Sequence, residues 1–178
     1  MLNLLFSPKG RVNPQEFMRG VYIITGLMVV IGLLPLLNPM LAIVGMVGIL
    51  LIWCWIALCA KRFHDSGKTG WLALVVIIGF FIGSYFLGQF IQATFAGDAM
   101  AAYEAQVKAF AESGDTAGIM GLMTGDGMKS IVRKTAIPSA VGTVILSLAL
   151  AFVVNKLSPH DPEENQYGPA GSVGNTFD

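Results

Sequence analysis

The sequence predicts an all-α, multi-pass membrane protein with four transmembrane helices and an amphipathic helix in a long extracytoplasmic loop. Charged residues make up only 12% of the chain and apolar residues make up 54%, whereas soluble proteins carry about twice that share of charge. No Asp, Glu, Lys or Arg occurs in residues 20–60, 69–97 or 135–155, and such stretches are typical of membrane spans. This composition excludes a soluble enzyme, a nucleic-acid-binding protein and a disulfide-stapled secreted module.

The first uncharged stretch is long enough to cross a bilayer twice, because one crossing needs about 20 apolar residues. Asn38 and Pro39 supply the turn between the two crossings. We therefore expect the first span at residues 17–37 and the second at residues 40–60.

The start of the first helix is marked by its capping residues. Asn13 is suited to be the N-cap, Pro14 fits the first helical position, and Glu16 follows three residues after the cap. We expect the helix to begin there.

The third span is expected at residues 70–95 and the fourth at residues 136–154. The resulting organisation is an N-terminal segment (1–16), three spans with a cytoplasmic loop at 61–69 (17–95), an extracytoplasmic loop (96–135), the fourth span (136–155) and a cytoplasmic tail (156–178). Small residues at helical spacing indicate close helix packing, within the chain or in a homo-oligomer: Gly79, Gly83, Ser139, Thr143, Ser147 and Ala151.

The long loop has two halves. Residues 98–113 place four apolar side chains on one helical stripe, with charged residues elsewhere, which predicts an amphipathic helix that lies on the membrane or extends the third span. The glycine-rich residues 114–127 predict a mobile connection, which acts as a solvated spacer or as a binding lid.

The distribution of Lys and Arg predicts the orientation. Seven basic residues flank the spans on the side of the two termini: Lys9, Arg11, Arg19, Lys61, Arg62, Lys68 and Lys156. The other side has none in the first hairpin and four in the long loop, namely Lys108, Lys129, Arg133 and Lys134. We therefore expect both termini in the cytoplasm. The spans themselves contain no ionisable Asp, Glu, His or Arg relay, which disfavours a coupled transporter and leaves a passive pore possible.

The loop between spans two and three carries most of the polar chemistry. The Gly67-Lys68-Thr69 sequence lacks the earlier glycine of a phosphate-binding P-loop. His64 and Asp65 are adjacent, so a regular helix cannot aim both at one metal ion. No cofactor or metal is expected. The Arg62 and Asp65 side chains have the i,i+3 spacing of a salt bridge.

Three motifs together resemble the bacterial inner-membrane proteins of the domain of unknown function 805 family. They are Phe6-x-x-x-Gly10-Arg11-x-Asn13-x-x-Glu16-Phe17, then Arg62-Phe63-His64-Asp65 with Gly70-Trp71, then Asn165-Gln166-Tyr167-Gly168-Pro169. This chain has Met18 where many members have Trp and Lys61 where many have Arg, and residues 98–134 look like an insertion. The resemblance implies the fold and an inner-membrane location, but no activity.

All three motifs fall on the predicted cytoplasmic side, so we expect their polar residues to form one cap. The candidate ligand-binding residues are Arg11, Glu16, Arg62, His64, Asp65, Lys68, Trp71, Asn165 and Tyr167. The cap either holds the tail against the loop or binds an anionic lipid headgroup or a protein partner.

Two other function classes stay open from the sequence. One is a small transporter or channel, and the other is a lipid-modifying enzyme that uses His64 and Asp65. No pair of nucleophile and base is recognisable, so we assign no catalytic residue.

Overall fold

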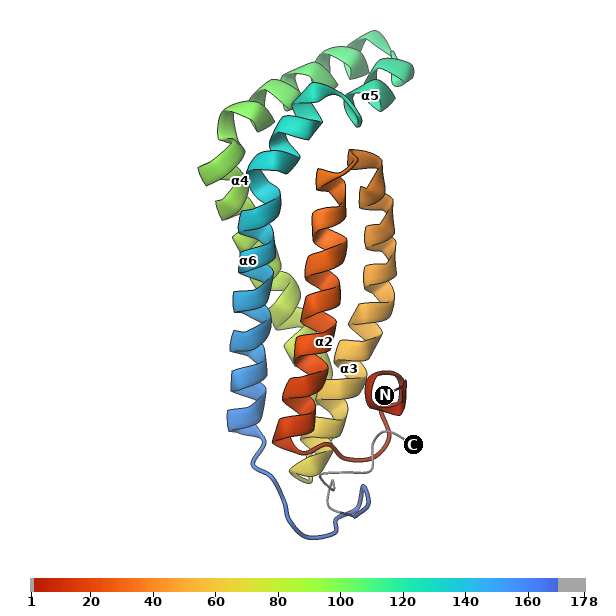
Figure 1. Cartoon of the computed structure of the whole chain (residues 1–178), viewed down its shortest axis with the longest axis vertical. Helices are drawn as coiled ribbons and strands as arrows, with labels where there is room; N and C mark the ends of the chain where they lie inside the picture. Colours follow the sequence, from red (N-terminus) through yellow and green to blue (C-terminus); the bar gives the residue numbers. More distant parts are fainter. Residues whose placement is uncertain (1, 170–178) are drawn as a thin grey trace. The chain divides into compact units, whose positions relative to one another are not determined.

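The computed structural model describes residues 2–169, and these residues confirm the all-α fold class (Figure 1). In chain order the elements are α1 (Leu2–Phe6), α2 (Pro14–Leu33), the 3-10 helices η1 (Leu34–Leu36) and η2 (Pro39–Val47), α3 (Gly48–Asp65), α4 (Leu72–Ser113), α5 (Thr116–Leu122) and α6 (Asp126–Leu157). The predictions for the tail beyond Pro169 lie outside the described residues.

Four stretches within residues 2–169 are helical, long and apolar enough to cross a membrane. They are Pro14–Leu36, Pro39–Asp65, Leu72–Ser113 and Thr116–Leu157, and they agree with the four predicted spans. Most of their side chains face outward, as expected where lipid rather than water surrounds a helix. The chain is therefore built as a multi-pass membrane protein.

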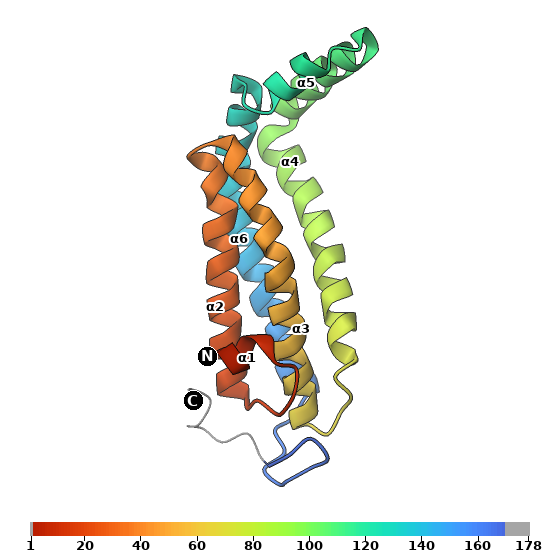
Figure 2. The ribbon, with the colours of Figure 1, turned by 90° about the vertical axis from the view of Figure 1, so that its right-hand side faces the viewer.

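The chain divides into two compact units, which we describe separately. The first takes its described residues from Met1–Met28, Val47–Gly83 and Val144–Asp178, and the second consists of Val29–Met46 and Ser84–Thr143. The first unit holds all of α3 and one end each of α2, α4 and α6, together with α1 and the start of the C-terminal tail. In both views of the ribbon, α1 lies beside the end of α3 within this unit (Figure 2).

The start of α2 follows the predicted capping pattern. Asn13 Oδ1 accepts a hydrogen bond of 2.9 Å from the backbone N–H of Glu16, which satisfies one of the amide groups left free at a helix start. Pro14 is the first helical residue. Val12 and Phe17, which precede and follow the N-cap residue Asn13, are fully buried, so the chain enters α2 along a fixed path.

The second span extends further than expected at its polar end. Helix α3 continues past Ala60 to Asp65, so Lys61 and Arg62 belong to the helix instead of a loop. Both side chains are nonetheless buried, because other segments of the first unit accept their hydrogen bonds. At the other end of this span, Asn38 Oδ1 accepts from the N–H of Met40 at 2.9 Å and begins the 3-10 helix η2.

Most of the loop at 98–134 is helical. Residues up to Ser113 are helical, but non-helical dihedral angles at Ala96 (φ −139°, ψ 16°) divide α4 into two helices joined by a kink. The predicted role of residues 98–113 as an amphipathic surface helix stays a prediction.

The glycine-rich half of this loop is more ordered than its composition predicts. Gly114 takes a positive φ of 70° and ends α4, and Asp115 then caps α5 by accepting from the N–H of Gly118 at 2.8 Å. Helix α6 already begins at Asp126, well before the predicted start of the fourth span.

Glycines allow close helix contacts within each unit. A Cβ placed on Gly83 would lie 2.9 Å from Leu146 of α6, whereas one on Gly79 would meet nothing within 4 Å. Of the predicted small residues on α6, Ser147 and Ala151 are buried in the first unit, Thr143 is half-buried and Ser139 is exposed in the second. Two further close contacts were not predicted: Gly20 with Leu58, and Gly142 with Leu87.

Candidate functional site

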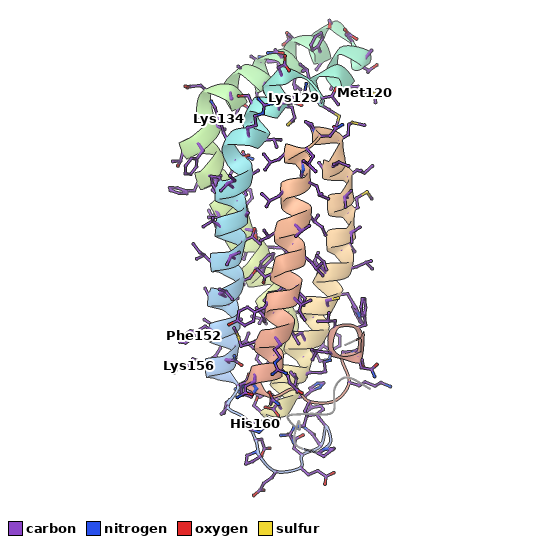
Figure 3. The ribbon with its side chains drawn as sticks, viewed as in Figure 1. Met120, Lys129, Lys134, Phe152, Lys156 and His160 are labelled. Carbon is purple, nitrogen blue, oxygen red and sulfur yellow. The ribbon has the colours of Figure 1, made fainter. Side chains whose placement is uncertain are left out.

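Three segments that are distant in sequence meet at the polar end of the first unit. They are the stretch before α2, the last turn of α3, and the tail from Ser158 to Pro169. Each carries one of the three sequence motifs. Figure 3 labels His160, where the tail leaves the end of α6. We call this region the cap.

Asp65 is the centre of the cap. Its side chain has no exposed surface, and Arg11 lies 3.2 Å from Oδ1 while Arg62 lies 2.7 Å from Oδ2. His160 Nδ1 is 2.8 Å from the same Oδ2. The predicted pair of Arg62 and Asp65 is therefore present, and two longer-range partners join it. We call these four residues the cap cluster.

Arg62 connects the end of α3 to the end of α6. Its Nε donates to Asn155 Oδ1 at 2.7 Å, and its Nη2 donates to the carbonyl of Ser158. Lys68 donates to the neighbouring carbonyl of Leu157. The last carbonyls of a helix have no partner within the helix and carry partial negative charge, so two cations stabilise this end of α6.

The Arg11 side chain binds the backbone of the tail. Its Nη1 donates to the carbonyls of Glu163 at 2.6 Å and Gly168 at 3.1 Å, and its Nη2 donates to the carbonyl of Asp161. Its Nε and Nη2 face the Asp65 carboxylate at 3.3 and 3.2 Å. Each of the three guanidinium nitrogens of Arg11 thus has a partner in the protein.

The tail forms a tight turn that places Tyr167. Asn165 and Gly168 exchange two backbone hydrogen bonds of 3.2 and 2.9 Å, and Gly168 has a φ of 118°, which favours glycine. Asn165 Nδ2 donates to the carbonyl of His64 at 3.1 Å. The Tyr167 ring then stacks on the His64 ring, with centroids 3.9 Å apart and planes 10° apart.

A carboxylate of the tail has a shifted pKa. The pKa of Asp161 is lowered from its ordinary value, first by the N–H of Glu163, which donates to its Oδ1 at 3.0 Å. The hydrogen bond from Asn165 and the positive charge of Arg11 lower this pKa further. These interactions favour the ionised carboxylate.

Lys61 and Glu16 support the start of the chain. Lys61 Nζ donates to the carbonyl of Asn3 at 2.7 Å and to that of Leu4, which fixes α1 against α3. The buried carboxylate of Glu16 is close enough to interact electrostatically with this ammonium group. The backbone of Val12 donates to the Lys61 carbonyl at 3.3 Å.

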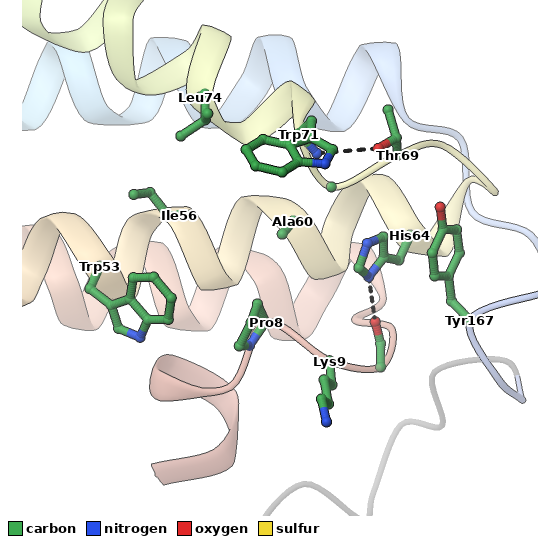
Figure 4. Close-up of a pocket in the computed structure, with 12 residues that line it drawn as sticks. Pro8, Lys9, Trp53, Ile56, Ala60, His64, Thr69, Trp71, Leu74 and Tyr167 are labelled. Carbon is green, nitrogen blue, oxygen red and sulfur yellow. Dashed lines mark hydrogen bonds between the residues drawn. The ribbon is translucent and has the colours of Figure 1, made fainter.

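An open cavity of about 790 Å³ lies beside the cap cluster, entirely within the first unit (Figure 4). We call it the cap groove. Its lining residues are Pro8, Lys9, Gly10, Trp53, Ile56, Ala60, His64, Thr69, Gly70, Trp71, Leu74 and Tyr167. No carboxylate lines it, and the lining is mostly apolar. Trp71 is 76% exposed at its edge, and Trp53 donates from its indole N–H to the carbonyl of Phe6 at 2.9 Å.

The structure divides the nine candidate ligand-binding residues into two groups. His64, Trp71 and Tyr167 line the cap groove. The other six, whose polar groups contact the protein itself, are Arg11, Glu16, Arg62, Asp65, Lys68 and Asn165. Whether any of the nine binds a ligand stays a prediction.

Sequence analysis missed four residues of this region. His160 belongs to the cap cluster and Asn155 contacts it from α6. Both are far from the central motif in sequence, so no spacing pattern indicated them. Lys9 and Trp53 line the cap groove. Lys9 lies in the segment before the first predicted span, where a cation is a usable signal, whereas Trp53 falls inside the second predicted span.

Two further features bear on ligand binding. Within residues 2–169, no group of three or more His, Cys, Asp or Glu side chains is placed to hold a metal ion. A second cavity of about 410 Å³ lies in the second unit, between the turn at residues 35–40 and the first turns of α6, where Lys129 and Arg133 line it.

Comparisons with known proteins agree with the motif-based resemblance. The model of the family described as "Protein of unknown function (DUF805)" matches residues 5–169, which is nearly the whole chain and includes all three motifs. No curated protein and no solved structure matches the chain. The comparison therefore places the motifs in a family without adding an activity.

Proposed function

Because this chain belongs to the DUF805 family, whose description assigns no function, we propose a function from the geometry of the cap: the protein is a bacterial inner-membrane protein that binds an anionic membrane lipid in the cap groove. The observation that carries the proposal is the lining of the groove, which combines apolar and indole surfaces with a cation and contains no carboxylate.

The cap cluster supports this function by organising the groove, without itself contacting the lipid. Arg11 and Arg62 are buried and already donate to Asp65 and to tail carbonyls. A phosphate group that displaced these partners would leave Asp65 buried without its counter-charges, which is costly. The structural and the ligand-binding roles expected for the cap thus fall on different residues.

The chemistry of the groove fits an amphiphile. Ile56 and Leu74 provide surface for acyl chains, and the exposed indoles of Trp53 and Trp71 are of the kind enriched where hydrocarbon meets headgroups. Lys9 lines the same groove and forms no salt bridge among the described residues. A cation near a membrane surface attracts an anionic headgroup by about 1 kcal/mol.

The cytoplasmic orientation belongs to the same proposal. Seven of the eleven Lys and Arg residues belong to the first unit, which carries the cap, and basic flanks favour the cytoplasmic side of a bacterial membrane. A reporter domain fused after Asp178 tests the side. Activity of a reporter that functions only in the periplasm would contradict this orientation.

Lipid binding is tested with the full-length protein in detergent micelles, to which phosphatidylglycerol or phosphatidylcholine is added. Native mass spectrometry then counts the bound lipids. We expect preferential retention of phosphatidylglycerol by the parent protein. Lys9→Gln should lower this affinity about fivefold, because one headgroup cation is lost. Trp71→Ala should also lower it, because one edge of the groove is removed.

The matched control is Phe81→Ala. Phe81 is an exposed aromatic residue of α4 that does not line the groove. This variant should retain phosphatidylglycerol like the parent. If the parent binds both lipids equally, or if Lys9→Gln and Trp71→Ala retain the anionic lipid as the parent does, the proposed function is wrong.

A further inference from the structure

We infer that the lipid bound in the cap groove carries a hydroxyl-bearing anionic headgroup, of the glycerol type, and that His64 Nε2 accepts a hydrogen bond from that hydroxyl. This inference rests on the proposed function and names the ligand class of the same site. It depends on the tautomer of His64, on the space in front of Nε2, and on the other polar groups of the groove.

The partner of His64 Nδ1 fixes the tautomer of the neutral ring. Nδ1 lies 3.2 Å from the carbonyl oxygen of Gly10. A carbonyl oxygen can only accept, so the hydrogen must be on Nδ1. In the neutral imidazole, Nε2 then carries a lone pair and acts as an acceptor.

The ring is held so that Nε2 faces the groove. Tyr167 stacks against one face of the ring at 3.9 Å, and Figure 4 shows the second ring nitrogen directed toward the side of the groove formed by Trp71. A Cβ on Gly70 would lie 2.7 Å from Nε2. A side chain at residue 70 would therefore crowd this nitrogen, and glycine avoids that contact. No hydrogen bond to Nε2 is present among residues 2–169.

The neighbouring groups suit a phosphate. The Thr69 hydroxyl oxygen accepts from the backbone N–H of Trp71 at 3.4 Å, so its hydrogen stays available to donate. Lys9 adds a positive charge to the same groove. A phosphate diester accepts from both kinds of group, but it has no hydrogen to offer to His64 Nε2.

The headgroup must therefore supply a donor of its own. An ammonium headgroup supplies one, but it brings a positive charge into a groove that contains Lys9 and no carboxylate. A glycerol headgroup supplies neutral hydroxyl donors beside the phosphate. This combination favours a glycerol-headed lipid over phosphatidylethanol, which is a phosphate diester of the same charge but lacks the hydroxyls.

The test is a competition between phosphatidylglycerol and phosphatidylethanol, two diesters of equal charge with identical acyl chains, added in equal amounts to the full-length protein and read by native mass spectrometry. The parent should retain phosphatidylglycerol in preference, by about fivefold for one added hydrogen bond. His64→Phe keeps an aromatic ring for Tyr167 to stack on and removes the acceptor, so the retained ratio should fall toward one.

A second variant reaches the same nitrogen without changing His64. Gly70→Ala places a methyl group against Nε2, and it should lower the ratio even if His64→Phe does not fold. Phe81→Ala should keep the ratio of the parent. Equal retention of the two lipids by the parent, or an unchanged ratio in both variants, overturns the inference while the proposed function stands. Retention of neither lipid overturns both.

Discussion

Replacing Asp65 by Asn is expected to release the C-terminal tail. Asp65 forms the salt bridges of both Arg11 and Arg62, and all three side chains are almost completely buried. Asn has nearly the same shape but no charge. The substitution therefore leaves two buried guanidinium groups without their counter-charge and places an amide donor against other donors.

The expected magnitude follows from this burial. Breaking a buried ion pair by removing one partner costs about 3–5 kcal/mol. The bonds of Arg11 to the tail carbonyls depend on the same guanidinium position, so we assign this cost to tail docking. The equilibrium ratio of docked to undocked tail should then fall at least about 100-fold.

Thiol labelling at Ser158 measures tail docking directly. Ser158 begins the tail and has no exposed surface, so a Ser158→Cys thiol is protected while the tail is docked. The natural Cys54 and Cys59, which are free and buried in α3, are replaced by Ala in the parent. In the Asp65→Asn background, labelling of Ser158→Cys should be at least about 100 times faster than in the parent.

The control is Asp126→Asn, which is the same substitution at an exposed pair. Asp126 lies 3.3 Å from Lys129 with its side chain fully exposed, and such pairs contribute about 0–1 kcal/mol. Labelling of Ser158→Cys should not change in this background. If Ser158→Cys is labelled as slowly in the Asp65→Asn background as in the parent, the cap cluster does not hold the tail, and the reasoning from the burial of the cluster is refuted.

Three other substitutions or conditions have defined outcomes. Asn13→Ala should lower the free energy of unfolding by about 1 kcal/mol, because the first turn of α2 loses its cap; an unchanged midpoint of unfolding in SDS would contradict this role. Gly83→Ala should give a lower midpoint than Gly79→Ala, because both gain helix propensity but only the Cβ at Gly83 meets Leu146, whereas the one at Gly79 has open space; equal midpoints would show that this contact does not matter. The pKa of Asp161 is lowered in the docked tail, so its contribution to docking is present above the ordinary carboxylate pKa and is lost as the pH falls through the lowered value. Labelling of Ser158→Cys should accordingly accelerate on acidification below about pH 4, once corrected for thiol ionisation, and less so with Asp161→Asn.

The sequence was sufficient for features that depend on local spacing. The four spans follow from their length and composition, the cap of α2 from Asn13 and its neighbours, and the pair of Arg62 and Asp65 from their i,i+3 spacing. Each of these involves residues within one or two helical turns, or one continuous stretch. Periodicity and propensity determine such features almost alone.

The contacts between segments could not be predicted in the same way. Arg11 and His160 reach Asp65 from opposite ends of the chain, and no spacing rule relates them. The basic residues Lys61 and Arg62 suggested a loop, yet they stay helical and buried because carbonyls of other segments accept their hydrogen bonds. The glycine-rich segment forms α5 because Asp115 caps it, which composition alone did not indicate.

The hydrogen bonds from Arg11 to the tail limit which changes in the sequence of the tail are tolerated. The three tail oxygens that accept from Arg11 are main-chain carbonyl oxygens, and every amino acid carries such an oxygen. The side chain at Glu163 can therefore be exchanged while these hydrogen bonds persist, whereas removing a single residue between Asp161 and Gly168 would shift the oxygens out of reach. Selection on this segment should consequently conserve its length more strictly than its chemical composition.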